Sequence, residues 1–334
     1  MKDVYILGIE SSCDETSASI VKNGTDEVAT VISSQIDIHK SYGGVVPEIA
    51  SREHVKNITM VIEECLEQAK LSLDDISAIA VTYGPGLIGS LLVGIEAAKT
   101  IALAHDKPLI GIHHITGHIY SNNLVKELEF PLLALIISGG HTELLYMKDR
   151  FSHELLGATL DDAVGECYDK VARVMGIPYP GGPKIDKLAQ SGKHNYDLPV
   201  PMKDDSLNFS FSGLKSAVLN LVNKEKMAGR EINSEDLAKS FQDVVVESLA
   251  NKTKKALETK DIKRFIIAGG VAANSAVRAK MEELAKEKNI EFLAPPIKYC
   301  TDNAAMIASA AYYYFEAGKV DDLSIYAKSS DELK

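Results

Sequence analysis

One pattern occurs twice in the chain, and it limits the possible folds more than any other feature. Residues 4–21 form a short apolar stretch, a polar turn and a second stretch that alternates small and apolar side chains. Residues 132–147 repeat this order around the turn Ser138–Thr142. Each copy predicts two strands joined by a turn and opens one half of the chain, so the pattern predicts an internal duplication. Between two such turns facing each other across a cleft, a nucleotide-like ligand would fit.

The repeat and the chain length together predict two α/β domains. A chain of 334 residues suits about two domains with ample core. We expect an N-terminal domain over residues 1–131 and a C-terminal domain over residues 132–334. The segment 187–235 is polar and lysine-rich, which predicts an insertion that could cover a cleft. The last predicted helix, 304–316, can pack back across the domain interface.

Composition and charge exclude several classes of protein. Hydrophobic residues make up 46% and charged residues 25%, as in ordinary globular proteins. No apolar stretch is long enough to span a membrane. The four cysteines lie far apart and form no CxxC pair, which predicts reduced thiols in a cytoplasmic protein. The net charge of −11 argues against a protein that coats nucleic acid unaided, because phosphate contacts need clustered Lys and Arg.

The stretch Gly111–His118 predicts a candidate metal site. Its apolar beginning is typical of a buried strand, and the polar residues that follow, through Glu127, predict a helix. Side chains four apart share a helix face, so His114 and His118 point the same way. Two histidines leave a divalent site incomplete, and a third ligand must come from elsewhere. The alternative is a helix with surface or hydrogen-bonded histidines.

Further polar residues permit both a structural and a functional interpretation. Asp302 stands where the N-cap of the last helix belongs, so capping and metal ligation compete. Asn274 follows a glycine turn and can either cap a helix or hydrogen-bond a ligand. Residues 160–175 predict a helix with acidic side chains, including Asp169, on one face, which is usually a solvated face. The Gly/Pro turn beyond it, with Asp186 nearby, favours a ligand wall.

The motifs, taken in order, resemble those of the TsaD family, also called the Gcp/YgjD or glycoprotease family, from end to end. One such motif would be weak evidence, but coincidence cannot explain all of them over nearly the full length. The motifs that carry the resemblance are Gly8–Thr16, Val46–Glu48, Thr82–Gly86, His114–His118, Ser138–Thr142, Tyr168–Lys170, Tyr179–Pro183, Gly269–Asn274 and Cys300–Asn303.

The resemblance implies a fold, an activity and a metal. Family members have the actin/hexokinase-like (ASKHA) fold, with two duplicated α/β domains flanking a ligand cleft. They transfer a threonylcarbamoyl group from threonylcarbamoyl-AMP to N6 of the adenosine 3′ of the anticodon, in tRNAs that read codons beginning with A. One divalent ion, Fe²⁺ or Zn²⁺, is implied, with His114, His118 and Asp302 as its ligands.

The resemblance also implies roles for further residues and a set of partners. Asp14 and Glu15 match residues that the family needs for activity, and either is a candidate to accept the proton of N6. The implied partners are tRNA, an inactive TsaB-like paralogue, a TsaE-like P-loop ATPase, and a TsaC-like enzyme that supplies the adenylate. The helix over residues 55–70 is a candidate paralogue surface. The implied contacts to the adenylate ligand are Ile136, Ile137, Ser138, Gly139, Gly140, Asp169, Gly182, Asp186 and Asn274.

Three other functions fit parts of the sequence. A sugar kinase or ATPase relative would share the turns, but Mg²⁺ prefers oxygen ligands and leaves the histidines unexplained. A metallopeptidase lacks support because no glutamate follows His114 as in HExxH. A non-catalytic scaffold would have no need to keep every ligand. The acyl-transfer hypothesis uses a metal as electrophile at the carbamoyl carbonyl.

Overall fold

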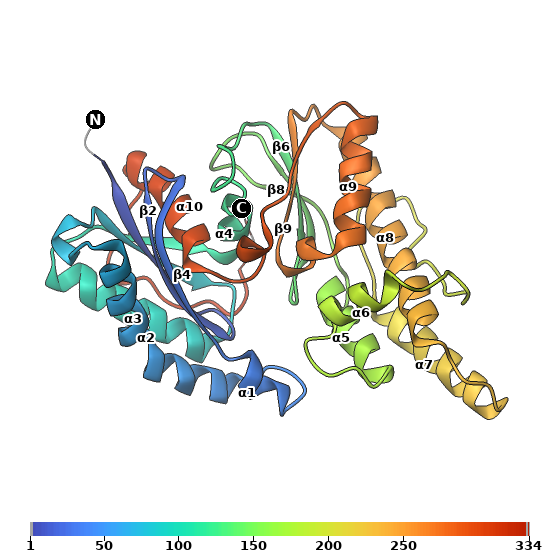
Figure 1. Cartoon of the computed structure of the whole chain (residues 1–334). Coiled ribbons are helices and arrows are strands. Elements are labelled where there is room, and N and C mark those ends of the chain that lie inside the picture. The colour runs from blue at the N-terminus through green and yellow to red at the C-terminus, as the bar shows by residue number, and fades with distance from the viewer. Residues whose placement is uncertain (1–2, 332, 334) are drawn as a thin grey trace. The chain divides into compact units, whose positions relative to one another are not determined.

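The computed structural model describes residues 3–331 and 333, which form two compact units (Figure 1). The first unit combines the chain up to Leu128 with the chain from Pro295 onward, and the second is the continuous stretch Glu129–Ala294. The expected boundary at 131/132 therefore lies close to the point after Leu128 where the chain passes from the first unit to the second. The expectation that everything after residue 132 belongs to the second domain is corrected for the segment from Pro295, because that segment packs into the first unit.

The first unit is built on a five-stranded mixed sheet with the order β3-β2-β1-β4-β5. The first three strands pair antiparallel, whereas β1, β4 and β5 run parallel. Parallel strands share an edge at their carboxyl ends, so the residues that follow β1, β4 and β5 gather there. The strands are β1 (Tyr5–Glu10), β2 (Glu15–Lys22), β3 (Asp26–Ser34), β4 (Ala78–Gly84) and β5 (Leu109–His113).

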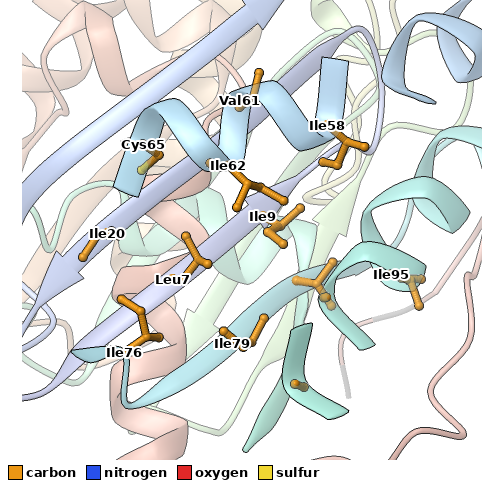
Figure 2. Close-up of a cluster of buried hydrophobic side chains, with 14 of the residues drawn as sticks. Leu7, Ile9, Ile20, Ile58, Val61, Ile62, Cys65, Ile76, Ile79 and Ile95 are labelled. Atoms are coloured by element: carbon orange, nitrogen blue, oxygen red, sulfur yellow. The ribbon is translucent and has the colours of Figure 1, made fainter. Parts of the chain in front are cut away.

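Helices α2 and α3 cover one face of this sheet and close the main core of the unit. Side chains such as Ile58 and Ile62 from α2 and Ile95 from α3 pack on Leu7 and Ile9 of β1 (Figure 2). Pro47 opens α2, because its fixed φ suits the first helical turn. The helices of the unit are α1 (Ile36–Lys40), α2 (Pro47–Ala69), α3 (Ile88–Ala104), α4 (His114–Tyr120) and α10 (Ala304–Glu316), with 3₁₀ turns η1 (Leu73–Asp75) and η3 (Ile297–Tyr299).

Helix α10 brings the end of the chain back to the beginning. It contacts β1, β2, β4, β5 and α4, and its first eight residues are buried. Gly8 of β1 permits this approach, since a Cβ there would lie 2.5 Å from the Ala304 carbonyl oxygen. The carboxyl-terminal end of the chain is thus part of the first unit's core rather than an addition to the second.

The second unit repeats the first sheet's topology. Its order is β10-β9-β6-β7-β8, with β6, β7 and β8 antiparallel and β6, β9 and β10 parallel. Strand β6 therefore has the place of β1, β7 that of β2, and β9 that of β4, as the duplicated pattern predicts. The strands are β6 (Leu132–Ile137), β7 (Thr142–Met147), β8 (Glu154–Ala158), β9 (Arg264–Ala268) and β10 (Glu291–Leu293).

The segment expected as an insertion lies in the second unit and is less than half helical. Residues 187–235 contain the end of α6, all of α7 and the first turn of α8, joined by loops. The rest of the segment is loop, and α7 packs on α5. The helices are α5 (Val164–Val174), α6 (Gly182–Ala189), α7 (Ser212–Met227), α8 (Ser234–Thr259) and α9 (Ser275–Glu287), with the 3₁₀ turn η2 (Gly270–Ala273).

Several helix boundaries differ from the sequence-based expectations. Helix α2 starts at Pro47, eight residues before the expected start at residue 55. Its first turns are polar, but Pro47 is a good first helical residue. The helix after His114 ends at Tyr120 rather than Glu127. Helix α5 starts at Val164 rather than 160. Among the described residues, no helix combines the length and the apolar character needed to cross a membrane.

Candidate metal centre and nucleotide-binding residues

The two motif histidines lie on the short helix α4, directly after β5. The imidazole of His113 caps this helix by accepting a hydrogen bond from the backbone N–H of Ile115 at 3.2 Å. The rings of His114 and His118 meet edge to face, with centroids 4.6 Å apart, as the four-residue spacing predicts. Both side chains are almost completely buried, so the alternative of surface histidines is excluded.

Asp302 joins this pair from the other end of the chain. Its Oδ1 lies 3.5 Å from His114 Nε2 and 3.3 Å from His118 Nε2. The N-cap of α10 is Asn303, whose side chain accepts a hydrogen bond from Met306 N. The structure therefore decides against capping by Asp302 and places its carboxylate beside the two imidazoles.

The three side chains fit a divalent metal ion. Their ligand atoms all lie within 4.8 Å of one another. Ligands about 2.0–2.1 Å from a tetrahedral ion lie about 3.4 Å apart, close to the two measured distances. Neither ring nitrogen of buried His118 has a hydrogen-bond partner, which is costly unless another group binds there. Two imidazoles and one carboxylate suit Fe²⁺ or Zn²⁺.

A buried carboxylate that sequence reasoning missed supports His114. Glu10, the last residue of β1, is fully buried and lies 3.3 Å from His114 Nδ1. Burial alone would lower the pKa of His114, but the carboxylates of Asp302 and Glu10 raise it to about 9. The sequence signal was available, since an acidic residue ending an apolar strand in Gly8–Thr16 has no obvious structural use.

Asp14 and Glu15 occupy the turn between β1 and β2 and the start of β2. Both side chains are largely buried, and Asp14 Oδ2 has no hydrogen-bond partner. Burial, reinforced by the neighbouring charges of Asp14 and Asp302, raises the pKa of Glu15 well above its usual value. Glu15 also accepts a hydrogen bond from Ser34 Oγ. The turn thus places two largely buried carboxyl groups side by side, Glu15 with a raised pKa and Asp14 next to it.

His54 and Gln35, two residues that sequence reasoning missed, hold this turn in place. His54 Nε2 donates to the Cys13 carbonyl at 2.9 Å, and its Nδ1 accepts from Thr16 Oγ1 at 2.7 Å. The backbone N–H of Gln35 donates to the Asp14 carbonyl. The side chains of His54 and Thr16 are fully buried, and together these bonds fix the turn from both sides. Their positions, far apart in sequence, gave no signal.

In the second unit, the β6–β7 turn contains the residues expected to contact phosphate or carbonyl oxygens of a ligand. Ile136 and Ile137 are fully buried strand residues, so only their backbone atoms could meet a ligand. Ser138 closes the turn, because its N–H donates to the His141 carbonyl and its Oγ accepts from His141 N. A Cβ added at Gly139 or Gly140 would meet no atom within 4 Å. These glycines are therefore not required by packing and border open space.

Asp169 and Gly182 meet at the start of α6. Asp169 Oδ1 accepts the N–H of Gly181 at 2.7 Å, and Gly182 N–H also bonds this carboxyl. Burial raises the pKa of Asp169 despite these bonds. The carboxyl belongs to α5, so it fixes the glycine turn to that helix instead of facing solvent as on an ordinary polar face.

Asp186 and Asn274 belong to one polar network. Asp186 accepts from Ser275 Oγ at 2.8 Å and from Gln242 Nε2 at 3.1 Å. Asn274 caps α9 by accepting from the N–H of Ala276 and Val277, and its amide donates to Gln242 Oε1. The capping interpretation of Asn274 is therefore correct. Gln242 and Ser275 were missed, because neither belongs to a motif with a chemical signature.

Structural comparison defines the class of protein. The chain is similar to full-length HypF in its phosphate- and nucleotide-bound form, with a TM-score of 0.63 and 14% identity over 95% of this chain and 47% of that one. It is also similar to component A of the (R)-2-hydroxyglutaryl-CoA dehydratase of Acidaminococcus fermentans, with a TM-score of 0.57 and 16% identity over 93% and 98% of the two chains. The fold is thus actin/hexokinase-like.

Sequence comparison narrows this class to one family. The family model described as "TsaD: tRNA N6-adenosine threonylcarbamoyltransferase" matches residues 27–309. Proteins of that name from Bacillus thuringiensis (strain Al Hakam) and Bacillus subtilis (strain 168) are 57% and 56% identical. The first alignment covers all of this chain and 98% of the relative, and the second covers 95% and 92%. The chain belongs to the TsaD family of transferases.

Proposed function

We propose that this chain transfers the threonylcarbamoyl group of threonylcarbamoyl-AMP to N6 of the adenosine 3′ of the anticodon. The tRNA substrates would be those that read codons beginning with A. The observation that carries the proposal is the buried cluster of His114, His118 and Asp302 in a chain 57% identical to transferases of this name. A sugar kinase relative would have no use for that cluster.

The first unit would supply the groups that activate the acyl donor. His114, His118 and Asp302 would hold one Fe²⁺ or Zn²⁺ ion, a Lewis acid that polarises a carbonyl oxygen when bound. The cluster offers three protein ligands, which leaves a position for substrate, as is usual in catalytic zinc sites. Burial of both histidines keeps water from competing with the donor at this point.

Asp14 is the better candidate to accept the proton lost by N6. The N6 lone pair is delocalised into the adenine ring, so attack needs a base that takes the proton as the bond forms. Burial and the neighbouring charges raise the pKa of Glu15, which makes it the poorer proton acceptor of the two at a given pH, and Asp14 Oδ2 is buried without a hydrogen-bond partner in the turn. The bonds from His54 and Gln35 hold the Asp14 backbone still while it does so.

The second unit would hold the adenylate part of the donor. Gly139 and Gly140 border open space, where backbone N–H groups can approach phosphate oxygens closely. Asp169 fixes the glycine turn at Gly182, and Asp186 lies next to Ser275 at the start of α9. AMP would leave from these contacts once the acyl group has moved to N6.

The distribution of charge bears on how tRNA would bind. Residues 129–294 contain 23 Lys and Arg against 24 Asp and Glu, whereas the rest of the chain contains 13 against 23. The acidic excess therefore lies almost wholly in the first unit, which would repel a phosphate backbone. We propose that tRNA phosphates contact the second unit and a partner protein. TsaB-like and TsaE-like proteins are the proposed partners, with a TsaC-like enzyme supplying the adenylate.

A reconstituted reaction tests the proposal. The purified chain is combined with its paralogue and ATPase partners, synthetic threonylcarbamoyl-AMP and a tRNA that reads A-starting codons, and the nucleosides are scored by mass spectrometry. We expect threonylcarbamoyladenosine from the parent chain and none from His118→Ala. The matched control is His105→Ala, an exposed histidine after α3, which should retain metal and product. Product of equal yield from His118→Ala would refute the role of the cluster.

A further inference from the structure

Glu10 has no role in the proposed reaction so far, yet it is the most completely buried carboxylate near the histidines. It ends β1, and its side chain is inaccessible to water. An ionised carboxylate in such a place needs several hydrogen-bond donors to offset its lost hydration. A residue that costs this much to bury is expected to serve a specific purpose.

Three groups approach this carboxylate from three different elements. The N–H of Ser12 donates to Oε1 at 2.5 Å, and Thr82 Oγ1 at the end of β4 donates to Oε2 at 2.6 Å. The third is His114 Nδ1, which lies 3.3 Å from Oε2. Both oxygens of Glu10 accept hydrogen bonds, one from Ser12 and one from Thr82, as an ionised carboxylate does.

A carboxylate can only accept, so the contact with Glu10 requires a hydrogen on His114 Nδ1. Ser12 Oγ, 3.2 Å from the same nitrogen, can then accept as well. With Nδ1 held protonated, the proton that His114 gives up to bind a metal must come from Nε2, the nitrogen that faces Asp302. The direction of one hydrogen bond therefore decides which nitrogen of His114 is available to a metal.

We infer that Glu10 is a positioning residue that commits His114 to binding metal through Nε2. The inference rests on the proposed metal site and adds an outer partner to it. Histidine ligands commonly donate their second N–H to a carboxylate, and loss of that partner costs 10–100-fold in metal affinity. Ser12 and Thr82 supply further hydrogen bonds that offset the burial of this carboxylate, so its stability does not depend on His114 alone.

The test compares two variants of the same hydrogen-bonded group. Glu10→Gln keeps the shape of the side chain but replaces the carboxylate with an amide that can itself donate towards Nδ1. Thr82→Val removes a donor to Glu10 and leaves the His114 contact in place. The Zn²⁺ dissociation constant of each protein is measured by competition with a chromophoric chelator. We expect a 10–100-fold increase for Glu10→Gln and less than a threefold change for Thr82→Val.

The inference would be overturned if the Zn²⁺ affinity of Glu10→Gln stayed within threefold of the parent. It would also be overturned if Thr82→Val lost as much affinity as Glu10→Gln, because Glu10 would then matter only for packing of the sheet. A second readout needs no variant. Long-range ¹H–¹⁵N spectra of the Zn²⁺-loaded, ¹⁵N-histidine-labelled parent should show His114 protonated at Nδ1 and metallated at Nε2. Metallation at Nδ1 would overturn the inference, even if Glu10→Gln does not fold. A parent chain that binds no Zn²⁺ or Fe²⁺ would instead refute the proposed metal site.

Discussion

Asp14 differs from its neighbour Glu15 in having a buried oxygen without a partner. If Asp14 accepts the proton of N6, then Asp14→Asn removes the base but keeps the shape of the turn. We expect turnover to fall at least about 100-fold, the usual contribution of a general base. Metal content and adenylate binding, measured by elemental analysis and calorimetry, should stay at the parent level. Loss of adenylate binding would make Asp14 a binding residue.

A substitution at Gly140 can test whether the open space beside the β6–β7 turn binds a ligand, without disturbing the fold. A methyl group at this position would meet no protein atom within 4 Å, so Gly140→Ala should leave the melting temperature unchanged. The same methyl group would occupy the proposed adenylate position, and we expect affinity for threonylcarbamoyl-AMP to fall at least about tenfold. Gly213→Ala, equally open on α7, is the control and should bind normally. Unchanged affinity in Gly140→Ala would exclude this turn as the adenylate contact.

His153 predicts a pH dependence of stability. Burial lowers its pKa from 6.5 to about 4. Below pH 6.5, His153 therefore becomes protonated in the unfolded chain but stays neutral in the folded chain. Stability should therefore fall as the pH drops from about 6.5 to about 4, by on the order of 3 kcal/mol from this residue. His153→Gln should make the melting temperature depend less on pH over that range. The same slope in parent and variant would show that His153 is not responsible.

Individual residues show where sequence reasoning succeeds and where it stops. His114 and His118 were predictable because helical spacing alone puts both on one face. Asp302 could not be decided from its own surroundings, since the choice of Asn303 as the cap depends on backbone geometry. Glu10 was not predicted, because its partners His114 and Thr82 are separated from it by 104 and 72 positions.

At the scale of elements, the contact between β1 and α10 decides where Asp302 lies. A Cβ at Gly8 would stand 2.5 Å from the Ala304 carbonyl oxygen and 2.9 Å from Ala308 N, both backbone atoms that cannot rotate away. Gly8→Ala should push α10 off the sheet, at a cost of about 1–3 kcal/mol or more. Asp302 precedes this helix, so Zn²⁺ affinity should fall as well. Thermal melts and chelator competition check both effects.

The control for this contact is again Gly213→Ala, where the added methyl group enters open space. It should leave stability within about 0.5 kcal/mol of the parent. A Gly8→Ala protein with parental stability and metal affinity would show that α10 adjusts without moving its first turn.

Strand elements were easier to predict than helix ends. The two strand–turn–strand units were predictable because alternation and a polar turn are local features. The start of α2 was not, because residues 47–54 are polar and only the burial of His54 and Ala50 shows why that turn is helical. Strands β3 and β8 were also missed, since their pattern of burial is irregular.

For the whole molecule, the division into units predicts how pieces of the chain fold. Residues 129–294 form one continuous unit, and Arg264 ties its two ends together through Glu129 and Glu291. This fragment should unfold in a single cooperative transition when it is produced alone. Residues 1–128 alone should not, because without α10 one face of the first sheet loses its cover. Circular dichroism melts of both fragments test this, and a cooperative melt of 1–128 would contradict it.

The duplicated topology could be predicted at this scale, but the division of the chain could not. The repeat marks where each half begins, whereas the return of residues from Pro295 to the first unit depends on contacts far apart in sequence. From the sequence, the final helix was expected to be able to pack back across the domain interface. The apolar first turns of this helix are consistent with the buried position that it takes.

The late position of Asp302 has a consequence for how the protein is made. A ribosome synthesises His114 and His118 long before the carboxylate, and the whole second unit emerges between them. A nascent chain can therefore offer only two of the three proposed ligands until Asp302 has been synthesised. If the three side chains bind a metal as proposed, a product that stops before Asp302 should retain the ion poorly, so metal loading would report that synthesis has passed this residue.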